Sequence, residues 1–367
     1  MHLSSKLRLP LSALALLALV ARVSAQDPTD VVYLRDGVTE TGKVLEEPLS
    51  GLAFQPESGA KKTLQWADVQ SVEYGDAPDA FAAGQSALGA GDFEDALKQF
   101  SAVLAEQDLR PVVRQQALFQ KAGAELRSDA DGTEDAARAD YQQLLRDFPK
   151  GRFVRMACEN LMGLYLKKGD AAGAQTVLDD ASKGLSGVAG AEAIVGVLAG
   201  NMLLTSGKGD EAAKRFAAVE ALAGAEPALV QEARLGRART LILANKAAEA
   251  EPILRELVEK STIARVLSGA WNGIGDLGAK EGHDKRNTDR CLDAVFAYLR
   301  GVVQYKPLPG ETTIEYERAL AGAAQCFQYL SELESNPDKK KVWRDRQRDL
   351  VERLQREFPR SPFLEKG

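Results

Sequence analysis

The side chains that most often carry out catalysis are scarce in this sequence of 367 residues. Histidine occurs only at His2 and His283. A Ser-His-Asp or Cys-His arrangement would therefore depend on His283, and a zinc site with several histidine ligands is not possible beyond the first 25 residues. His283 belongs to the polar segment 281–285, which we expect to be a solvated loop. The histidine inventory thus argues against most hydrolytic and zinc-dependent enzymes.

The three cysteines, Cys158, Cys291 and Cys326, form no C-x-x-C pair. Cys158 and Cys326 stand among apolar residues of predicted helices, which predicts buried structural thiols. A Cys291–Cys326 disulfide is the alternative in an oxidising compartment, and an odd number of cysteines leaves at least one thiol free.

Other patterns that suggest chemistry have simpler explanations. Gly273–Gly278 spells G-x-G-x-x-G, but no strand comes before it, so we expect glycines that allow close helix packing. The segment 129–132 has the start of a calcium loop, yet its twelfth position is the shorter Asp140, which favours a helix cap. Adjacent acids such as Asp179 and Asp180 do not converge on one helical face. The sequence therefore predicts no catalytic, cofactor-binding or metal-binding residues, and a protein that is not an enzyme.

The first 25 residues have the features of a secretory signal peptide. A basic start precedes the apolar run 11–20, which is too short to span a bilayer, and small residues occupy 23–25. We expect cleavage before Gln26 and a periplasmic or extracytoplasmic location; the alternative is an uncut membrane anchor. No later segment approaches eighteen apolar residues, so we expect no integral membrane span after cleavage.

The whole chain has a net charge of −6. The signal contains three cations, Lys6, Arg8 and Arg22, and no acid, so its removal leaves −9. An acidic protein of this kind is a poor candidate for binding nucleic acid or anionic membranes.

Residues 26–77 have the composition of a small β-module. Five short β-rich segments lie between residues 30 and 75, and the turn pairs Asp36-Gly37 and Ser58-Gly59 separate some of them. The order of strands and turns resembles small SH3-like or Sm-like barrels. The alternative is an extended leader that pairs with nothing.

Residues 78–367 show a repeating helical pattern. A turn that often contains Gly or Gly-Asp is followed by an alanine and then, four positions later, by a large apolar residue. The anchor alanines stand at positions 96, 137, 174, 212, 250 and 294. The first four intervals are 37–41 residues, and the polar segment 281–290 lengthens the last. A regular distance of this kind predicts about six to seven stacked helical hairpins rather than an ordinary bundle.

This pattern resembles the tetratricopeptide (TPR) family. Trp271, Ile274 and Gly275 match the family's first helix, and Gly84 and Gly200 match its glycine. The matching second-helix pairs are Ala96/Phe100, Ala137/Tyr141 and Ala212/Phe216. The resemblance implies a mainly α, right-handed solenoid that binds proteins or peptides.

The segments 148–153 and 358–363 each begin with Phe-Pro followed by a basic residue. They resemble helix ends of periplasmic TPR proteins, such as the coordinator linked to the Tol–Pal system and the repeat lipoprotein of outer-membrane barrel assembly. This implies an envelope location with protein partners, although the lipid-anchored cysteine of the latter is lacking. The alternatives are a cell-wall-associated or catalytic envelope protein that uses the β-module as a targeting domain, and a spacer that binds nothing.

Family positions that line the binding groove can be placed on the fourth and fifth units. They are mostly apolar and lack the Lys/Asn set that clamps a terminal carboxylate. The resemblance implies an amphipathic or apolar peptide in this groove, with Asn201 and Arg239 fixing its register. The predicted partner-binding residues are Ile194, Val197, Asn201, Leu204, Leu235, Arg239 and Ile242.

The last helix, 342–358, is highly charged and follows Lys339-Lys340-Lys341. A polar outer face is typical of a terminal capping helix. The alternative interpretation is a basic docking patch.

Overall fold

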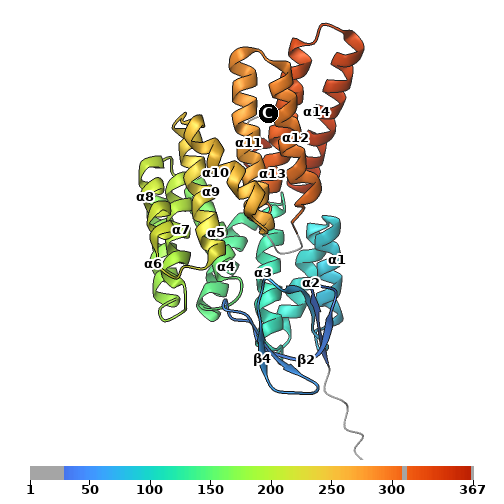
Figure 1. Cartoon of the computed structure of the whole chain (residues 1–367). Helices are drawn as coiled ribbons and strands as arrows, with labels where there is room; N and C mark the ends of the chain where they lie inside the picture. The colour runs from blue at the N-terminus through green and yellow to red at the C-terminus, as the bar shows by residue number, and fades with distance from the viewer. Residues whose placement is uncertain (1–28, 308–311, 365–367) are drawn as a thin grey trace, which may run out of the picture.

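The computed structural model describes residues 29–307 and 312–364, in which five strands precede fourteen helices (Figure 1). The predicted signal peptide, 1–25, and its cleavage site lie outside the described residues. Among the helices described, none is both long and apolar enough to cross a membrane.

The five strands form one antiparallel sheet in the order β4-β3-β2-β1-β5. Their bounds are Asp30–Leu34 (β1), Thr39–Glu46 (β2), Leu52–Pro56 (β3), Lys62–Leu64 (β4) and Val69–Glu73 (β5). Val32 and Phe54 are fully buried in its core. Gly42 in β2 has no room for a side chain, because a Cβ there would lie 2.7 Å from the Cα of Pro56. The five predicted strands are confirmed, and the alternative of an unpaired leader is wrong.

The helices follow as seven consecutive hairpins within the described ranges. Their bounds are Asp79–Ala90 (α1), Phe93–Ala105 (α2), Pro111–Arg127 (α3), Thr133–Asp147 (α4), Val154–Lys167 (α5), Ala171–Gly184 (α6), Ala191–Thr205 (α7), Gly209–Ala221 (α8), Pro227–Leu243 (α9), Ala247–Lys260 (α10), Ala264–Lys285 (α11), Thr288–Gln304 (α12), Ile314–Leu333 (α13) and Pro337–Glu357 (α14).

The Gly-Asp turns act as predicted. Gly91 has a φ of 79°, a left-handed conformation that glycine adopts without strain. Asp92 then caps α2, and its carboxylate accepts a hydrogen bond of 3.1 Å from the backbone N–H of Asp95. Gly169 and Asp170 repeat this geometry before α6. These turns therefore hold the two helices of a hairpin close together.

Glycine and aromatic residues fit together both within and between hairpins. The Phe216 ring of α8 is fully buried and lies against Gly200 of α7 and Gly236 of α9, where a methyl group at either glycine would overlap it. One ring thus joins its own hairpin to the next, as TPR-like stacking requires. Two further contacts of this kind are Gly84 with Phe100 and Gly275 with Tyr298.

The prediction of a loop around His283 is wrong. Helix α11 continues to Lys285, and only Arg286 and Asn287 separate it from α12. The His283 ring lies in the last turn of α11 and stacks on Tyr329 of α13, with 3.8 Å between ring centres. Within this polar stretch Gly282 is buried and packs directly against Cys291 of α12. The extra residues lengthen a helix rather than a loop.

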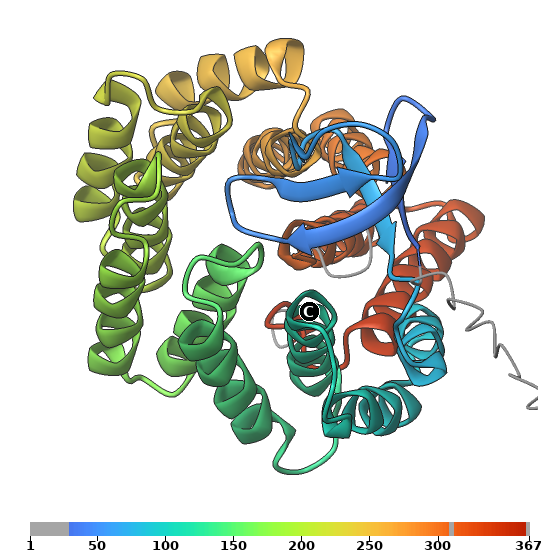
Figure 2. The same cartoon turned by 90° about the horizontal axis from the view of Figure 1, so that it is seen from below.

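The hairpins follow a curved path that returns on itself. The odd-numbered helices of neighbouring hairpins contact one another from α5 to α13, while α6 and α8 lie on the outside (Figures 1 and 2). Seen from below, the helices surround a central region, and the last hairpin lies near the first (Figure 2). The odd-numbered helices therefore form the inner row of the superhelix.

A segment after α14, here called the tail (358–364), closes this path. The Arg127 guanidinium of α3 lies between the Phe93 ring, at 4.7 Å, and the Phe358 ring, at 5.1 Å. Arg360 donates a hydrogen bond of 2.6 Å to the carbonyl of Ala130. The outer face of α14 is polar and only Leu354 is buried along it, as predicted for a capping helix.

The sheet is attached to the helices by buried polar contacts. Asp30 of β1 is fully buried and forms an ion pair of 2.6 Å with Arg110, next to the start of α3. The same carboxylate accepts hydrogen bonds from the backbone N–H groups of Val44 and Gly75. Pro48 also forms a β-bridge with Gly151, between α4 and α5. The β-module is thus fixed against the first helices.

Candidate partner-binding surface

The inner row of helices holds all seven residues that the sequence proposed for partner binding. Three of them are buried in the packing between helices: Ile194 and Val197 of α7 and Leu235 of α9 are exposed by 6%, 1% and 4%. Asn201, Leu204 and Ile242 are half-buried. The structure thus divides the predicted residues into a packed part and a more accessible part.

The accessible part lies where α7 and α9 end. Leu204 and Thr205 stand at the end of α7, and Ile242 and Leu243 stand at the end of α9. Leu243 is 66% exposed, which is unusual for a large apolar side chain. These residues and Asn201 form what we call the α7–α9 rim.

Arg239 has a partner inside the protein. Its guanidinium forms an ion pair with Glu315 of α13, and Asn272 of α11 donates hydrogen bonds to the carboxylate and the carbonyl of Glu315. Burial lowers the pKa of Arg239. Burial also pushes the pKa of Glu315 upward, but the cations of Arg239 and Arg318 overcome this and hold it below its usual value. Arg239 therefore connects α9 to α13 in this structure.

A second ion cluster joins helices that are two and three hairpins apart. Arg155 of α5 pairs with Glu232 of α9, and Arg265 of α11 contacts Glu159 of α5 at 2.9 Å. Burial would raise the pKa of Glu232, yet the nearby Arg155 and Arg265 lower it on balance. Since α5, α9 and α11 belong to the third, fifth and sixth hairpins, these contacts require a tightly curved superhelix.

The two clusters balance their own charges. Each guanidinium named above has a carboxylate partner, and Arg318 pairs with Asp276 in the same way. None of these four arginines is therefore left as a free basic clamp for a carboxylate on the described inner face. Sequence reasoning did not identify these pairs; the only available signal was the presence of charged residues on otherwise apolar inner helices.

The side chains most able to react or to bind a metal are buried or paired. All three cysteines are buried with free thiols. This was predicted for Cys158 and Cys326, and the alternative of a Cys291–Cys326 disulfide is wrong. Burial raises the pKa of Cys158 and Cys326 to about 12. Such thiols are poor nucleophiles near neutral pH. Among the residues described, no group of three or more His, Cys, Asp or Glu side chains is arranged to hold a metal ion.

A crevice of about 340 Å³ lies between α2, α3 and α4. Lys121 lines it and contacts Asp140 at 2.5 Å and Glu125 at 2.6 Å. Burial raises the pKa of Glu125 to about 7, with Lys121 opposing the shift. Because its ammonium group is paired with two carboxylates, Lys121 stays protonated and is not available as a nucleophile.

The hairpin contacts and the inner row define the class: a mainly α array of TPR-like hairpins that is preceded by a small antiparallel sheet. No family model matches the chain, and no curated protein matches it. Two solved TPR structures are similar. One, from Parabacteroides merdae, has 16% identity and a TM-score of 0.38, with 74% of this chain and 98% of that chain covered. The other is the C-terminal part of a TPR protein from Cytophaga hutchinsonii, with 12% identity, a TM-score of 0.33, and 78% and 98% covered.

Proposed function

We propose that this chain is an exported scaffold that binds protein partners in the cell envelope, and that the α7–α9 rim receives an apolar or amphipathic partner segment. The observation that carries the proposal is the exposure of Leu243, at 66%, together with the half-buried Leu204 and Ile242, at the ends of two inner-row helices that contact each other. Apolar side chains gathered on the inner face of a helical-repeat array are suited to helix-in-groove packing.

The proposal modifies the role of the other predicted residues. Ile194, Val197 and Leu235 are buried in the same two helices and contribute to their packing, and Arg239 holds α9 against α13. Asn201 remains the polar residue that can fix the register of a bound segment. The buried Asp30–Arg110 ion pair supports a sheet that acts together with the helices rather than as a separate targeting domain.

Site-specific photocrosslinking tests the rim. A benzoylphenylalanine at Leu243 should crosslink a distinct protein in envelope extract, and Leu204→Glu should abolish that product. The matched control is the same probe at Phe296 of α12, which is equally exposed at 64% but belongs to the second helix of its hairpin. Identical products from both positions, or products that survive Leu204→Glu in a folded protein, would remove the rim from consideration.

The proposed export rests on the basic start, short apolar run and small residues of the first 25 positions. Amino-terminal sequencing of the protein from the envelope fraction should begin at Gln26. Recovery of a chain that begins at Met1 in the cytoplasmic fraction would contradict export without affecting the rim.

A further inference from the structure

The first half of α14 carries a dense group of cations, all exposed except the half-buried Lys340. We call this group the α14 basic surface: Lys339, Lys340, Lys341, Arg344 and Arg346. None of the five forms an ion pair with any residue in the ranges 29–307 and 312–364, whereas Arg348, one turn further on, pairs with Asp345 at 2.9 Å. Between Pro337 and Arg348 the helix has six cations and two carboxylates, a net charge of +4 in a chain whose net charge is −6.

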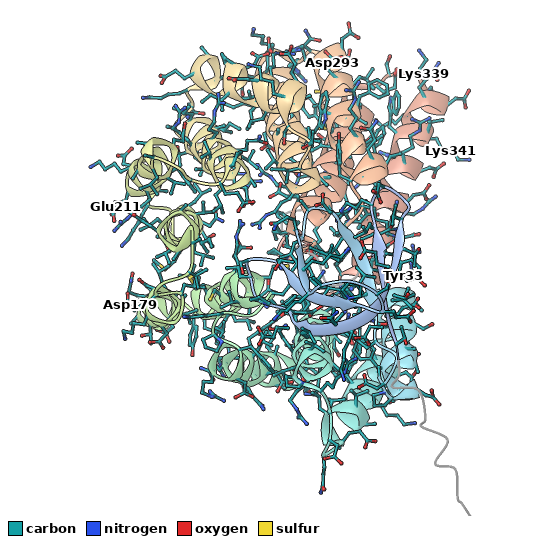
Figure 3. The ribbon with its side chains drawn as sticks, turned by 60° about the horizontal axis from the view of Figure 1, so that its bottom comes forward. Tyr33, Asp179, Glu211, Asp293, Lys339 and Lys341 are labelled. Atoms are coloured by element: carbon teal, nitrogen blue, oxygen red, sulfur yellow. The ribbon has the colours of Figure 1, made fainter. Side chains whose placement is uncertain are left out.

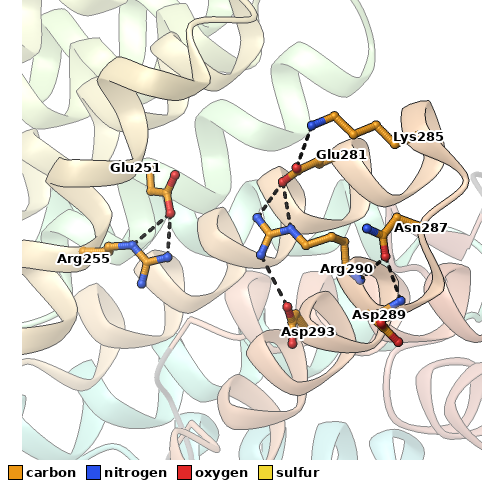
Figure 4. Close-up of polar contacts among 8 residues, drawn as sticks. All are labelled: Glu251, Arg255, Glu281, Lys285, Asn287, Asp289, Arg290 and Asp293. Carbon is orange, nitrogen blue, oxygen red and sulfur yellow. Dashed lines mark hydrogen bonds and ion pairs between the residues drawn. The ribbon is translucent and has the colours of Figure 1, made fainter.

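Cations on the surfaces of α10, α11 and α12, by contrast, form ion pairs with nearby carboxylates. At the end of α11, Lys285 contacts Glu281 at 2.9 Å, and Arg290 of α12 lies between Glu281 and Asp293 (Figure 4). The α10 helix pairs its own surface charges in the same way (Figure 4). Against this background, five cations without acidic partners on one helix form a distinct surface feature.

The position of these cations is locally unfavourable. Asn336 caps α14 by accepting hydrogen bonds from the backbone N–H groups of Asp338 and Lys339, so Lys339 and Lys340 lie in the first turn. The amino-terminal end of a helix carries partial positive charge and favours acids. Lys339 and Lys340 in this turn, and Lys341 just after them, repel the helix end and one another. Asp338 is the acid of the same turn, but none of the three lysines forms an ion pair with a described residue.

The surface is also held rigidly. Trp343 stacks on Phe327 of α13, with 5.7 Å between ring centres, and the Arg346 guanidinium lies over both rings. This contact fixes α14, so that Lys339 and Lys341 project away from the protein (Figure 3). Val342, which directly follows Lys341, is 45% exposed. A rigid charged helix with one apolar side chain loses little conformational freedom when it binds.

We propose that the α14 basic surface is a docking site for an acidic protein segment. Its carboxylates would meet the cations along about 10 Å of helix, from Lys339 to Arg346, and one of its apolar side chains would cover Val342. The inference rests on the proposed role as a protein-binding scaffold, but it concerns a surface separate from the α7–α9 rim.

Charge and shape favour a protein segment over other anions. The acidic chain as a whole is repelled by an anionic bilayer, and Val342 is the only large apolar side chain exposed on α14, too little for insertion into lipid. Single-stranded nucleic acid needs aromatic side chains on which bases can stack, and Trp343 is already stacked on Phe327.

Fluorescence anisotropy with a defined probe tests the proposal. The probe is a short fluorescein-labelled Glu/Asp peptide with one central Leu, and its counterpart has Lys in place of the acids. The variant Lys339→Glu/Lys340→Glu/Lys341→Glu should weaken binding of the acidic peptide about tenfold or more. The control Lys208→Glu/Lys214→Glu/Arg215→Glu at α8 gives the same change in net charge and should change binding less than about threefold.

Anionic vesicles and a single-stranded oligonucleotide form parallel arms of the experiment. Saturable binding of the acidic peptide that only the α14 variant loses supports the proposal. Equal loss in both variants, no binding by the wild type, or tighter binding to vesicles or oligonucleotide would overturn it. Crosslinking from Leu243 in the α14 variant separates the two surfaces, because it reports the rim whether or not the basic surface binds.

Discussion

Replacement of Phe216 by alanine should separate the fourth and fifth hairpins. The ring is fully buried and lies between Gly200 and Gly236, which have no side chains that could move into the space. A residual cavity of roughly 100 Å³ would cost about 2.4 kcal/mol at about 24 cal/mol per Å³. The lost burial of the ring adds about 2 kcal/mol. We therefore expect a total loss of about 4 kcal/mol in the free energy of unfolding.

Urea denaturation followed by circular dichroism measures this loss. In a repeat array each hairpin contacts mainly its neighbours, so the variant should also show a second transition or a smaller dependence of unfolding free energy on urea. The control is Phe296→Ala, the same substitution at a side chain that is 64% exposed, which should cost about 0.5 kcal/mol or less. A loss at Phe216 no larger than the loss at Phe296 would refute the idea that this ring joins the hairpins.

Three further predictions address other contacts. Asp30→Ala leaves Arg110 without its buried partner and should cost about 3–5 kcal/mol, with faster hydrogen exchange in β1 and β2; unchanged exchange there would show that the pair does not hold the sheet. Because the pKa of Glu125 is raised from 4.5 to about 7 by burial, the folded state binds more protons than the unfolded state between these values, so stability should fall as pH rises through this window. Glu125→Gln should remove that fall, and a carbon-13 NMR titration that places the carboxyl pKa near 4.5 would disprove the explanation. Arg127→Ala removes both ring contacts of the tail closure and should increase the radius of gyration in X-ray scattering, whereas Arg138→Ala, at an exposed ion pair within α4, should leave it unchanged.

The local features of the fold could be predicted because they depend on residues close in sequence. The turn at Gly91-Asp92 and the spacing of Ala212 and Phe216 reflect backbone conformation and helical periodicity. The prediction of a loop at His283 rests on local polarity, whereas in the structure Gly282 packs on Cys291 of α12 and His283 stacks on Tyr329 of α13, contacts that local polarity does not reveal. A glycine that lets two helices pack closely cannot be distinguished, in a single sequence, from a glycine that forms a turn.

The candidate site was harder to predict because its contacts are distant in sequence. Arg239 and Glu315 are 76 residues apart, and Arg265 and Glu159 are 106 apart. These pairs form only when several hairpins have curved together, and the amount of curvature is the sum of small rotations that the repeat pattern does not specify. The sequence could therefore place Arg239 on the inner row but could not show that its guanidinium is paired with Glu315.

The tail contacts also have a mechanical consequence. An open row of hairpins extends under tension like a spring, because each interface bends slightly. Here Arg360 of the tail is hydrogen-bonded to Ala130, 230 positions earlier in the chain, so the row of hairpins is closed into a ring. A load pulling the tail away from the first hairpins would be carried by the Arg127–Phe358 and Arg360–Ala130 contacts before any hairpin interface stretched, and the protein would remain stiff until those contacts broke.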